Sequence, residues 1–497
     1  MSCAVNSAVS ISGQRQVHRQ KYAAYVDKAA NIDLCKTVLR LALYLSGNGE
    51  SVYSHMLVQF THIIYKRQET EKYSLQKDFF KISEEVLALS EKAEKLAEAQ
   101  FEKIDDITEY NQQKVLAAFI NNKVSEAHLG ATTGYGYDDI GRDNLDRVVA
   151  EIFGTEDALV RYSFASGTHT ISTALFGLLR PGDRMLCACG LPYDTLLPVL
   201  GVKETPGSLK DFGVQIDVLE LLPDGTIDIG GLKQAIRSKK YKMLYLQRSR
   251  GYTLRPSYTA EECAAAIRTA KEMDSRIISM VDNCYGEFVG LYEPTQLGAD
   301  IMAGSLIKNP GGAIARCGGY IAGRSELIEL CAYRMTAPGV GREVGATLGM
   351  NRELYMGFFN APHVTGEAKK AAVFASALFS SLGYEVSPTH SQQRGDIIQS
   401  IVLGNEQRLS AFCCGLQSGA PVDSFVSPIP APMPGYDDKV IMSAGAFTGG
   451  SSIELSADAP LREPYAVWFQ GGFNYHSAKV GIMLAAENML KNNCLYK

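Results

Sequence analysis

Long apolar runs are missing from this sequence. The best candidate, residues 34–45, is interrupted by Lys36 and Arg40, whereas a membrane-spanning helix needs about 20 apolar residues in succession. A long run of Lys or Arg is missing too, and 49 Lys and Arg against 54 Asp and Glu leave a net charge of −5. Such a balance offers no basic surface to the phosphate backbone of a nucleic acid. We therefore expect no membrane span and no nucleic-acid partner, and we expect a small molecule as the ligand.

Metal-binding cysteine motifs are also missing, although the chain has 11 cysteines. No pair has the C-x-x-C spacing, and Cys187 and Cys189 lie too close together for a zinc site, as do Cys413 and Cys414. We expect reduced thiols and no metal.

Acidic side chains are missing from residues 1–26, which carry Arg15, Arg19 and Lys21. This composition is typical of a transit peptide, and it fits the terminus of a cytosolic protein equally well. The sequence therefore leaves two locations open, the cytoplasm and an organelle.

The rest of the composition is that of a globular protein, with 46% apolar and 21% charged residues. From about residue 78 to 119, apolar residues recur at helical spacing, which predicts an amphipathic helical arm. Short apolar strands then alternate with helices such as residues 260–273. The predicted strands are residues 158–160, 184–189, 215–219, 242–246, 277–281 and 301–306. This alternation predicts an α/β fold with a mostly parallel, doubly wound sheet.

The chain changes character after about residue 325. Spaced glycines over residues 339–357 favour a helical linker, residues 445–452 carry a Gly/Ser hairpin signal, and a closing helix is expected near residues 476–490. These signals predict a second, smaller α+β domain. The expected organisation is an N-terminal extension (1–77), a helical arm (78–125), a large domain (126–325), and a linker helix with a small C-terminal domain (326–497).

An amine and an acid follow two apolar strands of the predicted sheet. Lys308 comes shortly after the strand at 301–306, and Asp282 directly follows the strand at 277–281. The carboxyl ends of parallel strands meet at one edge, where open α/β folds bind their ligands. Pyridoxal phosphate needs a lysine that forms a Schiff base with its aldehyde, and a carboxylate that keeps its pyridine nitrogen protonated. A solvated loop lysine and a plain Asp–Lys ion pair are the alternatives.

Two further turns lead to the same edge. Residues 165–169 connect a strand to an apolar helix, so the helix N-terminus and the side chains of Ser166 and Thr168 can bind a phosphate. A plain helix cap is the alternative. Tyr193 follows the next predicted strand and can cover the face of a pyridine ring, although a half-buried loop tyrosine gives the same pattern.

Longer motifs surround these positions. They are Asn111-Gln112 with Lys114-Val115-Leu116, residues 133–139 (TGYGYDD), 180–183 (RPGD), 192–196 (PYDTL), 247–252 (QRSRGY), 281–287 (VDNCYGE) and 470–472 (QGG). Over about residues 80–490 the sequence resembles fold-type I pyridoxal-phosphate enzymes, and more specifically the methionine γ-lyase-like family that is also called the aluminium-resistance protein family. The resemblance implies a seven-stranded sheet in the large domain, a smaller C-terminal domain and pyridoxal 5′-phosphate as the cofactor.

The resemblance also implies a role for each matching position. Lys308 corresponds to the Schiff-base lysine, Asp282 to the partner of the pyridine nitrogen, and Tyr193 to the ring that stacks on the cofactor. The positions implied around the phosphate are Ser166, Gly167, Thr168 and Ser305.

In related γ-lyases a loop with Tyr and Arg from the neighbouring subunit completes the phosphate site. The comparable positions here, with a different spacing, are Tyr135, Tyr137 and Arg142. We therefore expect a homodimer or homotetramer. Such enzymes hold the substrate carboxylate with an arginine of the small domain, for which Arg462 is the candidate. A surface ion pair of Arg462 with Glu463 or Asp458 is the alternative.

Two other enzyme classes fail on their motifs. Ser305-x-x-Lys308 also occurs in serine acyl-transfer enzymes, but the S-D-N and K-T-G partners are missing. Residues 339–345 have the wrong glycine spacing for a nicotinamide site. We predict a pyridoxal-phosphate-dependent carbon–sulfur lyase that acts on a sulfur-containing amino acid by β- or γ-elimination. A transferase or aminotransferase with the same cofactor, and a non-catalytic binding or regulatory protein on this fold, are the alternatives.

Overall fold

The computed structural model describes residues 79–433 and 436–496. The predicted N-terminal extension (1–77), with its transit-peptide candidate (1–26), lies outside these residues. From Ile82 onward the chain forms one compact unit. Within the described part of the chain, no helix has both the length and the apolar content that crossing a bilayer requires.

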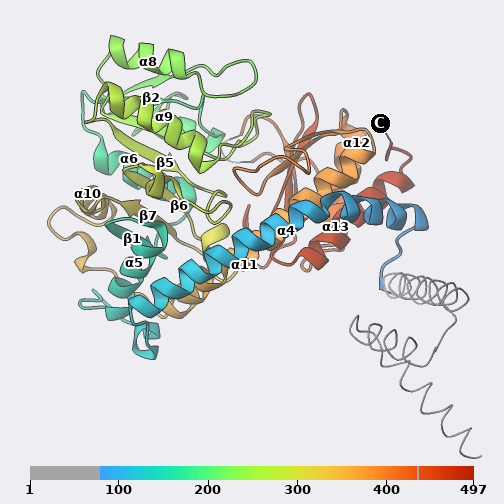
Figure 1. The fold of residues 1–497 in the computed structure, drawn as a ribbon, viewed down its shortest axis with the longest axis horizontal. Helices are drawn as coiled ribbons and strands as arrows, with labels where there is room; N and C mark the ends of the chain where they lie inside the picture. The colour runs from blue at the N-terminus through green and yellow to red at the C-terminus, as the bar shows by residue number, and fades with distance from the viewer. Residues whose placement is uncertain (1–78, 434–435, 497) are drawn as a thin grey trace, which may run out of the picture. The chain divides into compact units, whose positions relative to one another are not determined.

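The first part of this unit is built on a seven-stranded sheet (Figure 1). Its strands are β1 (Asp157–Arg161), β2 (Arg184–Cys187), β3 (Gln215–Val218), β4 (Met243–Gln247), β5 (Ile278–Asp282), β6 (Ile301–Ser305) and β7 (Gly319–Gly323). Their order is β1-β7-β6-β5-β4-β2-β3, and only β7 runs antiparallel to its neighbours. The predicted α/β fold with a mostly parallel sheet is confirmed, and β7 is the strand that the sequence analysis missed.

Helices cover both faces of this sheet. One face packs on α5 (Ile140–Phe153), α8 (Ile229–Ser238) and α9 (Ala260–Met273). The other face packs on α6 (Gly167–Leu178), the single turn α7 (Leu197–Leu200) and α10 (Ser325–Met335). Because successive strand residues point to opposite faces, Met243 and Tyr245 of β4 join the core with α6, and Leu244 and Leu246 join the core with α9. Short 3₁₀ turns stand at Glu126–Leu129, Asp194–Leu196, Pro294–Leu297, Asn309–Gly311 and Gly341–Glu343.

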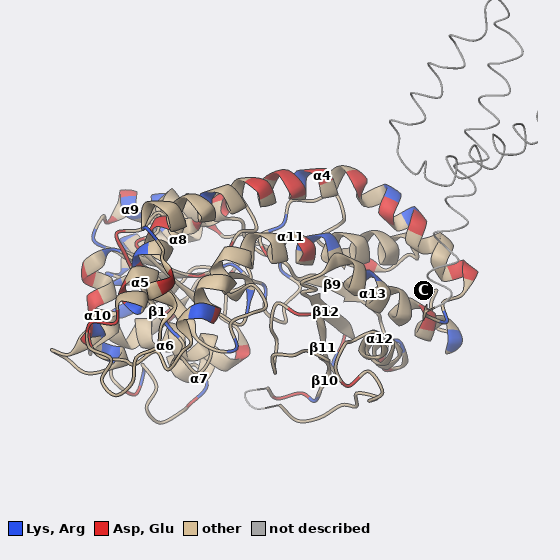
Figure 2. Cartoon of the chain, turned by 90° about the horizontal axis from the view of Figure 1, so that it is seen from below, with Lys and Arg blue, Asp and Glu red and all other residues tan. Residues whose placement is uncertain are grey.

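Two long helices, α4 (Glu84–Asn121) and α11 (Asn351–Ser381), lie side by side (Figure 1). Helix α4 is the predicted amphipathic arm: Val86, Ala97 and Ile104 are buried, and Figure 2 shows charged residues of both signs along the helix. The side chain of Ser83 caps its N-terminus by accepting a hydrogen bond from the backbone of Val86.

A second, five-stranded antiparallel sheet follows α11, in the order β10-β11-β12-β9-β8. Its strands are β8 (Glu385–Ser387), β9 (Gln399–Val402), β10 (Val440–Ser443), β11 (Ser456–Pro460) and β12 (Ala466–Gln470). Helices α12 (Glu406–Ser418) and α13 (Tyr475–Lys491) pack on each other beside it. Helix α13 matches the predicted closing helix, and the predicted hairpin signal at residues 445–452 lies in the connection between the antiparallel strands β10 and β11.

The predicted helical linker at residues 339–357 is wrong in its first part. Apart from the turn Gly341–Glu343, the chain is irregular until α11 begins at Asn351. Gly339, Gly341 and Gly345 all have positive φ angles, between 56° and 128°. A right-handed α-helix does not continue through residues with positive φ, so these glycines belong to a loop and not to a helix surface.

Candidate active site

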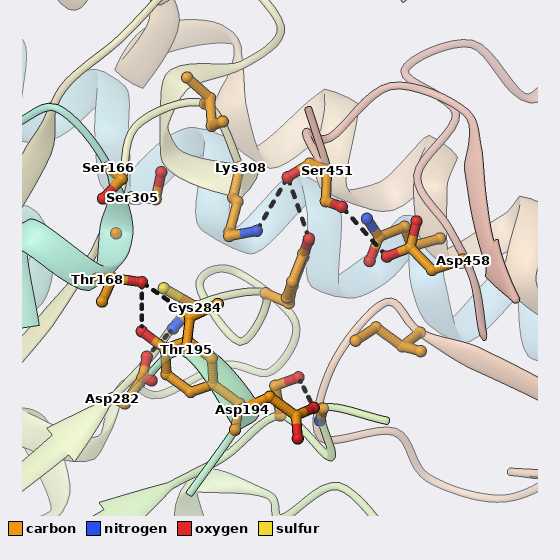
Figure 3. A pocket seen from close by; sticks show the side chains of 18 of the residues that line it. Ser166, Thr168, Asp194, Thr195, Asp282, Cys284, Ser305, Lys308, Ser451 and Asp458 are labelled. Atoms are coloured by element: carbon orange, nitrogen blue, oxygen red, sulfur yellow. Dashed lines mark hydrogen bonds between the residues drawn. The ribbon is translucent and has the colours of Figure 1, made fainter. Parts of the chain in front are cut away.

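The carboxyl ends of β4, β5 and β6 face a cavity of about 440 Å³ (Figure 3). Gln247, Asp282 and Ser305, the last residues of these strands, line the cavity on one side. Residues of the second sheet and its connections, such as Ser451 and Asp458, line the other side. The cavity therefore lies at the sheet edge where ligands of open α/β folds bind.

Lys308 enters this cavity from the segment between β6 and the turn Asn309–Gly311. Its Nζ donates a hydrogen bond to the backbone carbonyl of Ser451 at 2.9 Å and lies 3.6 Å from the centre of the Tyr285 ring. Burial lowers the pKa of the Lys308 amine, although the nearby Cys284 thiol and acidic side chains act in the opposite direction. An amine with a lowered pKa has a larger neutral, nucleophilic fraction.

Asp282 ends β5 and is 2% exposed. Its carboxylate accepts hydrogen bonds from the backbone N–H of Cys284 at 3.1 Å and from the hydroxyl of Tyr245 at 3.4 Å. Burial raises the pKa of Asp282 to about 6. A buried carboxylate of this kind is stabilised by a protonated nitrogen close to it, which is what a pyridine ring presents.

The turn before α6 forms a cradle beside these two residues. Ser166 caps the helix by accepting a hydrogen bond from the backbone of His169 at 3.1 Å. A Cβ atom on Gly167 would lie 3.2 Å from the Cβ of Ser305, so only glycine leaves this space open. Among the described residues, the buried hydroxyl of Ser305 has no hydrogen-bond partner. An unpartnered hydroxyl facing a helix N-terminus fits a bound phosphate.

Tyr193 lines the same cavity from the connection after β2. Its hydroxyl lies 3.0 Å from the hydroxyl of Thr168, and its backbone N–H donates to the side-chain oxygen of Gln247 at 2.9 Å. Burial raises the pKa of the Tyr193 hydroxyl. The structure thus brings together Lys308, Asp282 and Tyr193 with the predicted phosphate turn.

The three residues predicted to act on a neighbouring subunit lie elsewhere. Tyr135 and Tyr137 are 71% and 63% exposed, and their rings stack with centroids 5.5 Å apart. Arg142 is buried in α5 and donates hydrogen bonds to the backbone carbonyls of Gly136 and Gly345 at 2.8 and 3.1 Å. None of the three lines the cavity of its own chain, and their role in a partner's site stays a prediction.

Arg462 also lies outside the residues that line the cavity. Its guanidinium forms an ion pair with Asp438 at 3.0 Å and donates to the backbone carbonyl of Tyr252 at 3.4 Å. Asp438, and not Glu463 or Asp458, is therefore its acidic partner. Because Tyr252 lines the cavity, Arg462 stands at the rim.

Several lining residues were missed by the sequence analysis. Ser451 was predicted only as part of a hairpin, and Asp458 only as a surface partner of Arg462; both lie in the cavity, and Asp458 is 4% exposed. Tyr252 and Tyr285 belong to the QRSRGY and VDNCYGE motifs, which were the signals available for them. Residues from the second sheet could not be placed because their partners lie more than 140 positions away.

Known proteins resemble this chain over most of its length. A family model described as methionine gamma-lyase matches residues 86–490. The protein YnbB of Bacillus subtilis (strain 168) is 48% identical over 394 residues, which are 79% of this chain and 93% of that protein.

Two solved structures share the fold at high identity. A carbon–sulfur lyase involved in aluminium resistance from Clostridium novyi NT is 47% identical, with a TM-score of 0.81 over 84% of this chain and 98% of that one. A candidate cystathionine β-lyase involved in aluminium resistance from Clostridium acetobutylicum is 47% identical, with a TM-score of 0.82 over 85% and 99%.

These matches cover both sheets and every residue that lines the cavity. They confirm the family that the sequence motifs indicated, together with its cofactor, pyridoxal 5′-phosphate, for which the cradle at Gly167 and Ser305 has the required space and donors. The chain belongs to the methionine γ-lyase family of pyridoxal-phosphate-dependent carbon–sulfur lyases.

Proposed function

We propose that this enzyme cleaves a carbon–sulfur bond of a sulfur-containing amino acid by elimination at Cβ or Cγ. The main support for the proposal is that one cavity is lined by Lys308, Asp282, Tyr193 and the turn at Gly167. The products expected from a thioether amino acid and water are a thiol, a keto acid and ammonia.

Each residue of the site has a task in this reaction. When bound, pyridoxal phosphate withdraws electrons from the α-carbon of the substrate. The Lys308 amine would hold the cofactor and would accept the proton of that carbon, for which its lowered pKa suits it. Asp282 would keep the pyridine nitrogen protonated, and the Tyr193 ring would cover the cofactor ring. Ser166, Gly167, Thr168 and Ser305 would hold the phosphate.

The substrate carboxylate needs an arginine, because a planar guanidinium matches it with two hydrogen bonds. Arg462 is our candidate, since it stands at the rim and can leave its exposed partner Asp438. Arg316 is the second candidate, because it lines the cavity and forms an exposed ion pair with Glu353 at 2.6 Å.

The two candidates are separated by matched variants. Arg462→Lys keeps the charge but loses the paired hydrogen bonds, so we expect kcat/KM for a sulfur amino acid to fall by about tenfold or more while the visible spectrum of the cofactor is unchanged. Arg316→Lys is the control with the same chemistry. A fall in Arg316→Lys alone would move the role to Arg316.

We propose further that the enzyme is a homodimer or homotetramer in which the loop with Tyr135 and Tyr137 reaches the site of a neighbour. The support is the exposure of both rings on one chain and the resemblance of this loop to the γ-lyase pattern.

A visible absorption spectrum of the purified protein, followed by assays on a panel of sulfur amino acids, tests the proposed function. We expect a band of enzyme-bound pyridoxal phosphate and release of thiol, keto acid and ammonia together. Keto acid formed only with an added amino acceptor would indicate an aminotransferase. A bound cofactor with no turnover of any amino acid would indicate a binding or regulatory protein.

A further inference from the structure

One wall of the cavity consists of aromatic rings. Tyr252, Tyr436 and Trp468 all line it. The Tyr252 ring centre lies 5.1 Å from that of Tyr436 and 5.5 Å from that of Trp468. The indole N–H of Trp468 donates to the backbone carbonyl of Thr253 at 3.1 Å, which holds the ring in place. None of the tasks proposed above uses these rings.

A buried carboxylate stands in the same wall. Asp458 of β11 is 4% exposed, and its Oδ2 accepts a hydrogen bond from the hydroxyl of Tyr252 at 2.8 Å. It also accepts one from the hydroxyl of Ser451 at 3.2 Å (Figure 3). Its other oxygen, Oδ1, is buried and has no hydrogen-bond partner in the described part of the chain. A buried carboxylate oxygen without a donor is costly, so a donor from the ligand is expected there.

No cation that lines the cavity forms an ion pair with Asp458, although the positive charge of Lys308 acts on its pKa in the lowering direction. The lining acids are Asp194, Asp282 and Asp458, and the lining cations are Lys308 and Arg316. Lys308 donates to the carbonyl of Ser451 and holds the cofactor, Asp282 serves the pyridine nitrogen, and Arg316 is paired with Glu353.

We infer that this aromatic and acidic wall binds a positively charged group on the sulfur substituent of the substrate. The inference rests on the proposed function, which it deepens by naming the substrate class: thioether amino acids whose leaving thiol carries an ammonium group. Aromatic faces attract an organic cation, and a desolvated carboxylate supplies the charge and the acceptor that an ammonium needs.

The α-ammonium of the substrate is not the cation that this wall binds. The α-ammonium would lie beside the Lys308 amine, which donates its hydrogen bond to the Ser451 carbonyl and forms none with Asp458. The Asp458 carboxylate lies on the other side of Ser451 from the Lys308 amine, and it accepts a hydrogen bond from the Ser451 hydroxyl. The wall therefore meets the part of the substrate beyond the reacting carbons.

Three S-substituted cysteines of similar length test the inference. S-(2-aminoethyl)-cysteine carries an ammonium, S-propyl-cysteine replaces it by a methyl group, and S-(carboxymethyl)-cysteine carries a negative charge. We expect kcat/KM for the aminoethyl compound to exceed that for the propyl compound by about 10–100-fold, and the carboxymethyl compound to be the poorest of the three. Equal values for the aminoethyl and propyl compounds would overturn the inference.

Variants then assign the effect to Asp458. Asp458→Asn should reduce the aminoethyl-to-propyl ratio about tenfold or more, whereas Asp105→Asn, which changes an exposed carboxylate of α4 outside the cavity, should leave the ratio as it is. If the aminoethyl-to-propyl ratio is unchanged in Asp458→Asn, a group other than Asp458 binds the ammonium of the substrate.

A binding measurement separates this inference from the proposed function. After borohydride has reduced the bound cofactor, calorimetry compares the dissociation constants of the aminoethyl and propyl compounds without turnover. Tighter binding of the aminoethyl compound that depends on Asp458 supports the inference even if no thioether is cleaved, in which case only the proposed reaction fails. If all three compounds are cleaved at similar rates and bind with similar dissociation constants, the proposed reaction is supported and the inference about the charged substituent is wrong.

Discussion

Lys308 is partly buried and Lys369 is buried, and desolvation lowers the pKa of both amines, that of Lys369 to about 7. A nucleophilic amine alone therefore does not distinguish them. Lys369 lies in α11 and donates to the backbone carbonyl of Val289 at 2.7 Å, and it lines no part of the cavity. We propose Lys308 as the cofactor lysine because of its position at the sheet edge beside Asp282 and the predicted phosphate turn.

Borohydride reduction of the holoenzyme, followed by peptide mapping, tests this selection. We expect the pyridoxyl group on Lys308 and none on Lys369, because only Lys308 faces the cavity. Lys308→Ala should lose the visible cofactor band, and Lys369→Met should keep it. A pyridoxyl group on Lys369 would show that amine reactivity, and not position, decides.

Glu287 is a buried acid behind the site. Its Oε1 accepts a hydrogen bond from the hydroxyl of Tyr320 at 2.8 Å, and burial raises its pKa to about 8. At pH values between the ordinary pKa of a glutamate and about 8, the Glu287 carboxyl is protonated in the folded state and ionised in the unfolded state. The contribution of Glu287 to stability is therefore greatest at acid pH and is lost as the pH rises through this window.

Glu287→Gln cannot ionise, so its stability relative to the wild type should improve from pH 5 to pH 9, by roughly 3–5 kcal/mol. Urea denaturation of the two apoproteins at both pH values measures the difference. Glu98→Gln, on the exposed side of α4, is the control and should show no such change. A Glu287→Gln variant whose relative stability is the same at both pH values would contradict the assignment.

The residues that sequence could place are those next to a strand end. Asp282 and Lys308 follow apolar runs, and the pleat of a parallel sheet brings such positions to one edge. Ser451 and Asp458 follow no comparable signal. They reach the cavity because the second sheet packs against the first, and this packing depends on contacts between distant parts of the chain.

At the level of elements, β7 shows why a strand can escape sequence analysis. Its five residues include Gly319 and Gly323, so the apolar alternation typical of a strand is weak. The glycines are needed because the neighbours approach closely: a Cβ on Gly319 would lie 2.0 Å from the hydroxyl of Thr170, and one on Gly323 would lie 2.4 Å from the carbonyl of Asp300. Close packing of α6 on β7 thus removes the signal that would predict the strand.

Gly319→Ala tests the link between this packing and the cofactor. The added methyl group must displace Thr170 in α6, the helix whose N-terminus forms the phosphate cradle. We expect a loss of about 1–3 kcal/mol in stability and a dissociation constant for pyridoxal phosphate raised about tenfold.

Titration of the apoenzyme with pyridoxal phosphate and urea denaturation measure the two effects. Gly290→Ala is the matched control, because the nearest atom to its added Cβ is 3.9 Å away. If both variants bind the cofactor with equal affinity, the position of α6 does not depend on the glycine of β7.

For the whole molecule, the alternation of strands and helices was enough to predict the fold class, and the motifs were enough to predict the family. The motifs also led us to expect a homodimer or homotetramer, and this assembly stays a prediction, because an interface depends on which side chains the folded chain exposes. Tyr135, Tyr137, Ile140 and Leu348 are all between 55% and 71% exposed. The segments are joined by hydrogen bonds from Gly345 to the Tyr135 carbonyl and from Leu348 to the Thr132 carbonyl, so these side chains share one region. Apolar side chains gathered in this way are typical of a contact surface.

Complementation between two inactive variants tests whether this region completes a neighbour's site. Lys308→Ala removes the proposed cofactor lysine, and Tyr137→Ala removes a ring of the exposed loop. In a mixed dimer, the chain with Tyr137→Ala keeps its own Lys308 and receives an intact Tyr137 from the other chain, so one of the two sites is complete. Random pairing after coexpression gives about half mixed dimers and hence about a quarter of the wild-type activity.

The same experiment distinguishes the alternative in which Tyr137 acts within its own chain. In that case the mixed dimer has one site without Lys308 and one without Tyr137, and coexpression restores nothing beyond the activity of the separate variants. Arg142→Ala is a poor substitute for Tyr137→Ala here, because Arg142 holds the carbonyls of Gly136 and Gly345 and its loss would disturb the loop itself. Tyr137 is exposed and its ring contacts only Tyr135 among the ring contacts of the described residues, so its removal tests the reach of the loop into a partner without unfolding it.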